Sequence, residues 1–189
     1  MGNGKKLFVT KIKETTRFEK IVKRITTDVS ILKLLFKLGF DFLQIQIGTG
    51  LLQVSISADS KHAICKKNNS TTVKFRGGLN LTLKYNHSFE EFDEEIKKAD
   101  LVISDADLGS CVAVLKRNKP LLVVITQDMM DTRKLQNELA EQLQKNGHLN
   151  YCTVDNLEEG LTTAFKAYSK ADKNLFAKYL GKCLGFFNK

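Results

Sequence analysis

The segment that most constrains what this chain can fold into comprises residues 99–125. Two short apolar stretches rich in β-branched residues, Leu101–Ser104 and Leu121–Ile125, are typical of strands buried on both faces of a parallel sheet. Residues 109–115 between them predict a crossover helix. Because ligands in such units bind beyond the carboxyl ends of the strands, residues 104–110 are the first candidates for a binding loop.

The rest of the chain alternates between strand-like and helix-like patterns. Alternating or continuous apolar residues predict further strands at 6–10, 42–47, 51–57, 79–85 and 149–154. Apolar residues at helical spacing predict helices at 18–25, 30–38, 89–96, 135–143 and 157–168, with Gly39 and Gly147 as stop signals. This alternation predicts an α/β fold, a Rossmann-like parallel sheet with helices on both faces.

We expect a single domain over residues 1–189, because this length supports one sizeable core. Residues 58–78 are rich in Lys, Asn, Ser and Thr, and they predict a polar surface loop. The Gly48-Thr49-Gly50 run lacks the third glycine of a dinucleotide fingerprint, so it predicts a turn. Residues 173–187 predict a carboxyl-terminal amphipathic helix, which either closes the protein's own core or covers a partner.

The net charge of +9 is concentrated near the start of the chain, where residues 1–37 hold ten Lys or Arg against three Asp or Glu. A basic surface suits an anionic membrane, an acidic partner or nucleic acid. No aromatic residues interleave with the lysines, so we do not expect a nucleic-acid partner. No apolar run reaches the roughly 20 residues that cross a bilayer, and we expect a cytoplasmic protein. The four cysteines are too dispersed to predict a zinc site or a disulfide framework.

Several short motifs follow one another in a characteristic order. They are Leu7-Phe8-Val9-Thr10 with Thr15-Thr16 after it, Gln46-Ile47-Gly48, Ala99-Asp100-Leu101-Val102-Ile103-Ser104, Gly109-Ser110, Lys119-Pro120-Leu121, Met130-Asp131, Glu138-Leu139-Ala140 and Gly147-His148-Leu149. In this order they resemble the family of small catalytic subunits of the two-subunit UDP-N-acetylglucosamine transferase. More distantly, they resemble the carboxyl-terminal half of the bacterial lipid II glycosyltransferase.

The resemblance implies one half of a GT-B glycosyltransferase of the inverting, metal-independent kind. This half would bind UDP-N-acetylglucosamine. A membrane-anchored partner subunit would supply the lipid-linked acceptor, a dolichol-diphosphate-linked N-acetylglucosamine, at the cytosolic face of the endoplasmic reticulum. The residues that it implies for nucleotide-sugar binding are Ser104, Gly109, Ser110, Met130, Asp131, Gln136, Thr15 and Thr16. Those that it implies for partner binding are Leu175, Phe176, Tyr179, Leu180, Leu184 and Phe187.

The predicted binding loop departs from the family's Ser-His-Ala-Gly-x-Gly-Ser pattern. Asp105 replaces its histidine and Asp107 replaces its first glycine. Ala113 stands where the family has a carboxylate that is taken to bind the nucleotide ribose. Residues 130–136 are longer than the corresponding family stretch and lack its histidine, and residues 11–14 replace a glycine-containing loop. All these changes fall on the ligand side of the predicted fold.

The two aspartates of the loop allow different interpretations. Carboxylates at Asp105 and Asp107 would repel a diphosphate by several kcal/mol, against roughly 0.3–2 kcal/mol gained from the helix dipole. Their Asp-Ala-Asp spacing also suits Mg²⁺ or Mn²⁺, which could bridge them to the diphosphate. Either aspartate could instead cap the following helix. Apart from such a bridging metal we expect no cofactor.

Two functions therefore stand as expectations. The first is the UDP-N-acetylglucosamine-binding subunit of the transferase, and the second is a catalytically degenerate paralogue that serves as a non-enzymatic binding or regulatory partner. His62 lies in the polar loop, His87 just before a predicted helix start and His148 just after the Gly147 stop. All three positions predict turn or surface residues, so no general base is assigned. A basic nucleic-acid-binding protein is the weakest alternative, and it would require strongly salt-dependent binding.

Overall fold

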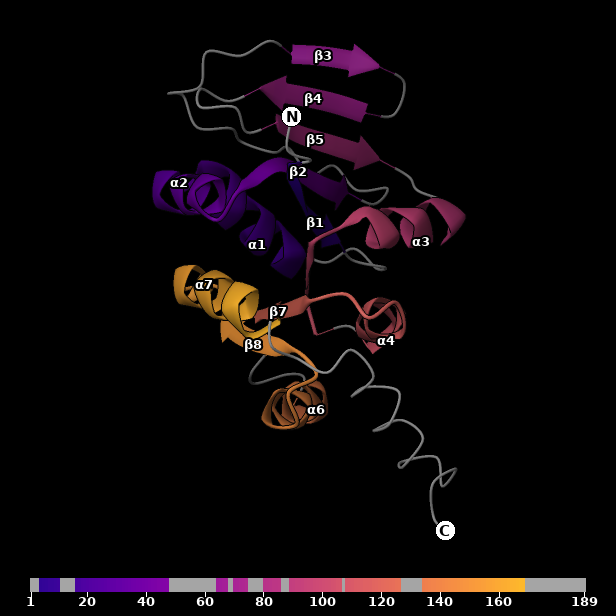
Figure 1. Cartoon of the computed structure of the whole chain (residues 1–189), viewed down its shortest axis with the longest axis vertical. Helices are drawn as coiled ribbons and strands as arrows, with labels where there is room; N and C mark the ends of the chain where they lie inside the picture. The colour runs from indigo at the N-terminus through magenta and orange to yellow at the C-terminus, as the bar shows by residue number, and fades with distance from the viewer. Residues whose placement is uncertain are drawn as a thin grey trace.

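A computed structural model describes residues 4–10, 16–47, 64–67, 70–74, 80–85, 89–106, 108–126 and 134–168 (Figure 1). The strands are β1 Lys5–Thr10, β2 Phe40–Ile47, β3 Ile64–Lys67, β4 Ser70–Lys74, β5 Asn80–Tyr85, β6 Leu101–Ser104, β7 Leu121–Ile125 and β8 Asn150–Thr153. The helices are α1 Thr16–Thr27, α2 Val29–Lys37, α3 Phe89–Lys98, α4 Leu108–Lys116, α6 Lys134–Lys145 and α7 Leu157–Tyr168. All the strands belong to one sheet.

The sheet has the order β3-β4-β5-β2-β1-β6-β7-β8, so the first strand of the chain lies in its interior. The strands from β5 through β2, β1, β6 and β7 to β8 are parallel to one another. β3 and β4 pair antiparallel at one edge. The predicted Rossmann-like parallel sheet is confirmed for the part that continues from β5 to β8.

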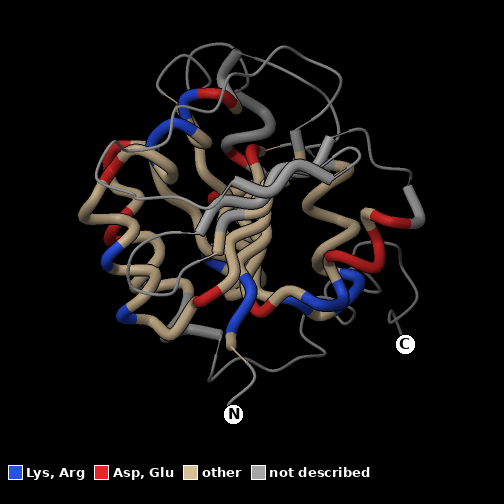
Figure 2. The backbone as a smooth tube through the Cα atoms, turned by 90° about the horizontal axis from the view of Figure 1, so that it is seen from above, with Lys and Arg blue, Asp and Glu red and all other residues tan. Residues whose placement is uncertain are grey.

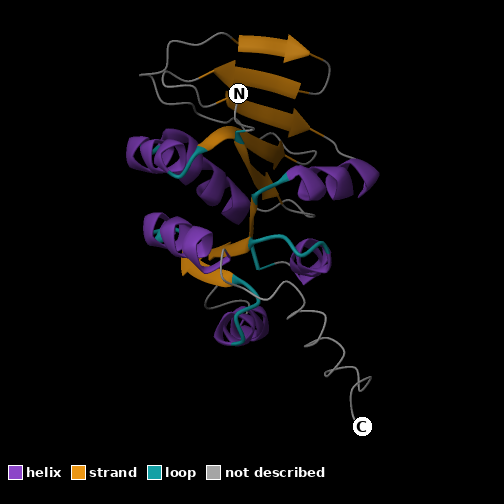
Figure 3. Cartoon of the chain, in the orientation of Figure 1, coloured by secondary structure: helices purple, strands orange, loops and turns teal. Residues whose placement is uncertain are grey.

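Helices cover both faces of the sheet, as predicted (Figures 2 and 3). Successive residues of a strand point to opposite faces, so Leu7 and Val9 join one core while Phe8 joins the other. The first core also contains side chains of α1, α2 and α7, and the second contains side chains of α3, α4 and α6. Each face of the sheet therefore has its own helical layer.

The strand-helix-strand unit predicted for residues 99–125 is present as β6, α4 and β7. Every residue of β6 and β7 is buried, as expected for strands covered on both faces. The predicted helix stops are also confirmed. Gly39 follows α2 with φ +85°, and Gly147 follows α6 with φ +76°, a backbone conformation that glycine adopts without strain.

The prediction of a surface loop over residues 58–78 is wrong for part of its length. Two of its segments form the antiparallel pair β3 and β4, which extends the sheet beyond β5. The prediction of a parallel sheet was therefore incomplete at this edge. The turn at 48–50, the strand at 51–57 and the carboxyl-terminal helix at 173–187 lie outside the described residues.

The helices are short in the part of the chain that the structure describes. The longest, α1, α6 and α7, have 12 residues each. None of the described helices has the length and apolar composition that a bilayer span requires.

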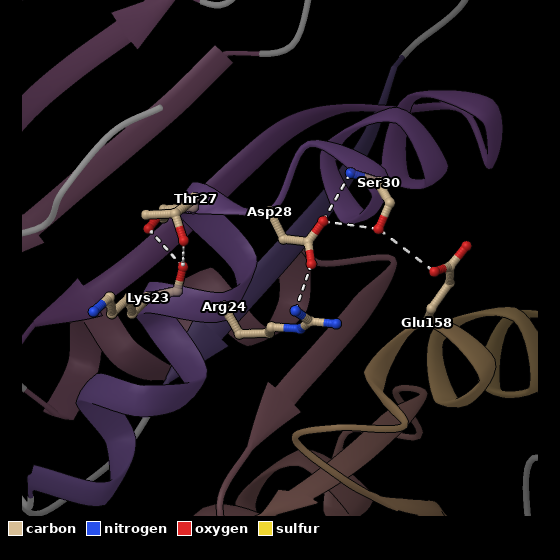
Figure 4. Close-up of polar contacts among 7 residues, drawn as sticks. Lys23, Arg24, Thr27, Asp28, Ser30 and Glu158 are labelled. Atoms are coloured by element: carbon tan, nitrogen blue, oxygen red, sulfur yellow. Dashed lines mark hydrogen bonds and ion pairs between the residues drawn. The ribbon is translucent and has the colours of Figure 1, made fainter. Parts of the chain in front are cut away.

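Asp28 is the N-cap of α2. Its carboxylate accepts hydrogen bonds from the backbone N–H and the hydroxyl of Ser30, both at 2.8 Å, and lies 2.6 Å from the guanidinium of Arg24 (Figure 4). These contacts, the Ser30 hydroxyl first, lower the pKa of Asp28 below its ordinary value of 3.8.

Replacing Asp28 with alanine should lower the free energy of unfolding by about 1 kcal/mol at neutral pH, because the helix loses its N-cap. The folded-state pKa is depressed, so this stabilisation is present above pH 3.8 and is lost as the pH falls through the lower folded value. Urea denaturation of both proteins at neutral and acidic pH measures the difference. Asp28→Asn, which keeps an N-cap side chain, should lose less stability; an equal loss would contradict the capping role.

Candidate functional site

The carboxyl ends of the parallel strands carry a group of buried and half-buried polar residues. Thr10 ends β1 and lies opposite Ser104, the last residue of β6. Its hydroxyl donates a 2.8 Å hydrogen bond to Oε1 of Gln46 on β2. Thr126 directly follows β7 and is also buried. Polar residues from four adjacent strands thus meet at one edge of the sheet, where α/β proteins bind their ligands.

Two of these hydroxyls have no hydrogen-bond partner among the described residues. They belong to Ser104, which is fully buried, and to Thr126, which is 4% exposed. A buried hydroxyl without a partner costs about 1–3 kcal/mol. A bound ligand or water that hydrogen-bonds to these groups would recover that cost. We call Ser104 and Thr126 the carboxyl-edge hydroxyls.

Helix α4 begins beside this group and carries Gly109 and Ser110 in its first turn. Gly109 is exposed, whereas Ser110 is buried. The first turn contains no acidic side chain. A helix N-terminus offers backbone N–H groups and the positive end of the helix dipole, both of which favour a phosphate. The structure therefore places Ser104, Gly109 and Ser110 in one strand-to-helix connection.

Asp105 follows Ser104 directly and is fully buried. The Cys111 thiol, one turn into α4, contacts the Asp105 carbonyl oxygen at 3.9 Å. Asp107 lies outside the described residues. Among the residues that are described, no group of three or more His, Cys, Asp or Glu side chains could hold a metal ion. The two-carboxylate metal site therefore stays a prediction.

Ala113 lies in the second turn of α4, half-buried against the core of that face. A methyl group cannot accept the hydrogen bonds that the family's carboxylate at this position is taken to accept from the ribose hydroxyls. The chain thus has an apolar side chain where the resemblance implies a ribose contact.

Several predicted site residues cannot be placed by side chain. Thr16 begins α1, the helix that follows β1. Gln136 lies in the first turn of α6, the helix that follows β7. The structure does not describe the side chains of these two residues. Thr15, Met130 and Asp131 lie outside the described residues altogether. The same holds for the predicted partner-binding residues, which are Leu175, Phe176, Tyr179, Leu180, Leu184 and Phe187.

His148 lies at the amino ends of the parallel strands, because it precedes β8. The candidate site lies at their carboxyl ends, after β1, β6 and β7. Burial lowers the pKa of His148, which favours its neutral form at neutral pH. Its position excludes it as a base at the carboxyl edge. His62 and His87 lie outside the described residues.

A cavity of about 310 Å³ runs along the edge strand β8, between α6 and α7. Its lining includes Tyr151, Cys152 and Glu159 but none of the residues predicted to bind a nucleotide sugar. Burial, with a smaller effect of Glu159, raises the pKa of the Cys152 thiol to about 12. At neutral pH this thiol is protonated and therefore a poor nucleophile.

The sequence prediction missed Thr10, Gln46 and Thr126 as members of the site. The signal for Thr126 was present, because it is a polar residue immediately after an apolar strand, as Ser104 is. No comparable signal existed for the Thr10–Gln46 contact, because it depends on β1 and β2 being neighbours.

Known proteins share this fold. The human UDP-N-acetylglucosamine transferase subunit ALG13 is 36% identical over 140 residues, which are 74% of this chain and 10% of the human protein. The chain thus spans about a tenth of the length of that relative. The NMR structure of ALG13 matches with a TM-score of 0.65 at 23% identity and covers 85% of both chains.

The crystal structure of Acinetobacter baumannii MurG matches with a TM-score of 0.51 at 16% identity, over 95% of this chain and 49% of that one. The match to about half of a second glycosyltransferase chain confirms the expected fold, one half of a GT-B enzyme. Residues 15–179 match the model of the glycosyltransferase family 28 C-terminal domain. This match covers most of the chain, including α1, β6 and α4, and the chain therefore belongs to the glycosyltransferase family 28 C-terminal domain family.

Proposed function

We propose that this chain is the UDP-N-acetylglucosamine-binding subunit of a two-subunit transferase. The observation that carries the proposal is the carboxyl edge of the sheet, where the carboxyl-edge hydroxyls Ser104 and Thr126 lie at the ends of β6 and β7 and α4 begins after β6. A diphosphate at the α4 N-terminus would receive backbone N–H groups near Gly109 and hydrogen bonds from buried hydroxyls. The family membership and the human relative's name support a sugar nucleotide as the ligand.

In this proposal the helix N-terminus also assists the reaction. When the glycosidic bond of UDP-N-acetylglucosamine breaks, negative charge develops on the departing UDP. The α4 dipole and N–H groups stabilise that charge without a metal ion. No residue is assigned as the general base that deprotonates the acceptor.

We further propose that the acceptor is a dolichol-diphosphate-linked N-acetylglucosamine and that the sugar is transferred with inversion. A membrane-anchored partner subunit would present this lipid-linked acceptor. The chain would then work as a peripheral protein at the cytosolic face of the endoplasmic reticulum. The resemblance of the sequence motifs to the transferase family supports these finer assignments.

A second function is favoured by one observation. Asp105 is fully buried at the position where the family has a histidine, so its negative charge would lie close to the proposed diphosphate. In the absence of a bridging metal this repulsion weakens nucleotide binding. A paralogue with such a site would keep the fold and act as a non-enzymatic binding or regulatory partner.

Titration calorimetry with UDP-N-acetylglucosamine, with and without Mg²⁺, distinguishes these functions. For the transferase subunit we expect binding without metal, and we expect Asp105→Asn to strengthen it about tenfold or more by removing a repelling charge. Asp41→Asn is the matched control, because it changes the same charge near the amino end of β2, at the opposite edge of the sheet.

The other outcomes are equally informative. Binding that requires Mg²⁺ and is lost in Asp105→Asn would assign the aspartate to a bridging metal. A lack of binding by both the isolated chain and its complex with the partner subunit would contradict the transferase function and support the degenerate paralogue.

A further inference from the structure

Helix α2 has apolar side chains on two opposite sides. Its sequence is VSILKLLFK, in which six of nine residues are apolar. Ile31 and Leu35 are fully buried in the core on the face shared by α1, α2 and α7. Val29 and Phe36 are 41% and 54% exposed. Since one buried stripe suffices to hold a helix on a sheet, the exposed apolar residues are not explained by folding alone.

The exposed residues form one continuous strip. In an α-helix, residues seven positions apart lie within about 20° of each other around the axis, so Val29 and Phe36 point the same way. Lys33 lies between them along the helix axis. The half-buried Leu32 borders the strip on one side, and Lys37 borders it on the other. We define the α2 outer face as Val29, Leu32, Lys33, Phe36 and Lys37.

The charge of this face is positive. Near the amino end of α2, Glu158 of α7 contributes one carboxylate, which accepts a 3.5 Å hydrogen bond from the Ser30 hydroxyl (Figure 4). α2 contains no acidic residue, and the carboxylate of its N-cap, Asp28, is bound by Arg24 (Figure 4). Among the described residues neither Lys33 nor Lys37 forms an ion pair. On the neighbouring α1, Lys23 is also exposed. Its backbone carbonyl accepts hydrogen bonds from the hydroxyls of Thr26 and Thr27, and among the described residues its ammonium group forms no ion pair (Figure 4).

We propose that the α2 outer face lies on an anionic lipid bilayer. A bilayer surface offers an apolar layer just below an anionic one. Phe36 and Val29 can enter the first while Lys33, Lys37 and Lys23 remain at the headgroups. The face matches a bilayer in depth as well as in charge, because the lysines lie beside the exposed apolar residues on one short helix. Lysines near an anionic surface each strengthen binding several-fold.

A protein partner fits the same face less well. Stable protein interfaces bury about 1,200 Å² or more, and they are depleted in lysine. The outer face of a nine-residue helix provides only two well-exposed apolar side chains and adds two lysines. The membrane contact is independent of sugar-nucleotide binding, so either proposal can fail without the other.

Vesicle flotation of the full chain tests the proposal directly. We expect binding to phosphatidylcholine vesicles that contain phosphatidylserine, little binding to pure phosphatidylcholine, and release as salt is raised. Lys33→Ala with Lys37→Ala should weaken binding about 25-fold, from about fivefold per lysine. Phe36→Ser should weaken it about tenfold.

Matched controls lie on the other side of the sheet. Phe42 on β2 is 43% exposed but belongs to the face of Phe8, so Phe42→Ser should leave vesicle binding unchanged. Lys98→Ala with Lys116→Ala removes the same charge from α3 and α4, on that same side. Circular dichroism confirms that each variant is folded.

Three results would overturn the proposal. They are no binding of the wild type to anionic vesicles, an equal loss in the control variants, and wild-type vesicle binding by the Phe36 and lysine variants. In the last case, loss of the partner subunit from the same variants in a pull-down would assign the α2 outer face to a protein instead.

Discussion

Replacing Phe8 with alanine should lower the free energy of unfolding by about 3–5 kcal/mol, because it empties the centre of one core. Phe8 is fully buried on β1, between β2 and β6. Its ring lies 6.2 Å from that of Phe92 on α3, in a tilted arrangement that adds to the energy of burial. Urea denaturation measures the change, and we expect a large fraction of the total stability of a domain of this size to be lost.

A second phenylalanine provides the matched control for Phe8. Phe36 is 54% exposed on α2, so Phe36→Ala removes the same atoms from a site that forms no core and should cost less than about 1 kcal/mol. Equal losses in the two variants would contradict the assignment of Phe8 to the core.

Placing a glutamate at Gly109 should weaken UDP-N-acetylglucosamine binding about 100-fold and leave the fold intact. Gly109 is exposed in the first turn of α4, where a negative side chain stabilises the helix by about 0.3–1 kcal/mol. The same carboxylate near a diphosphate would repel it by about 3 kcal/mol at a partly screened distance of about 5 Å. Titration calorimetry gives the affinity and thermal denaturation gives the stability.

Gly109→Gln separates charge from size in this experiment. Glutamine has nearly the shape of glutamate and no charge, so the glutamine variant should retain most of the affinity that the glutamate variant loses. If both variants lose affinity equally, the close approach of the backbone at Gly109, and not the electrostatic field of α4, governs binding. If neither loses affinity, the diphosphate does not bind at this helix.

Local patterns in the sequence predict most of the sheet and helices. The strands β6 and β7 are buried along their whole length, so each is a continuous apolar run. Helix α1 buries one face, so Phe18, Ile21 and Ile25 recur at helical spacing. Both patterns can be recognised without tertiary information. The strands β3 and β4 were missed. Their sequences, ICKK and STTVK, are short and mostly polar, as is common at a sheet edge where no helix demands an apolar face.

The candidate site could be predicted only in part for a related reason. The order of β6, loop and α4 along the chain predicts that Ser104 and Gly109 face a ligand together. The Thr10–Gln46 hydrogen bond and the place of Thr126 depend on which strands are neighbours across the sheet, which the sequence does not state. The complete burial of Asp105 is likewise a property of the packed molecule.

The interior position of β1 determines when this protein can fold during its synthesis. Lys6 donates its backbone N–H to the carboxylate of Asp100, which is added 94 residues later, and β1 pairs with β6 just beyond that point. Until then one edge of an apolar strand has no neighbour. Contacts between such distant residues form slowly, and an open strand edge invites pairing with other chains. A nascent chain that stops before β6 should therefore need a chaperone to remain unaggregated.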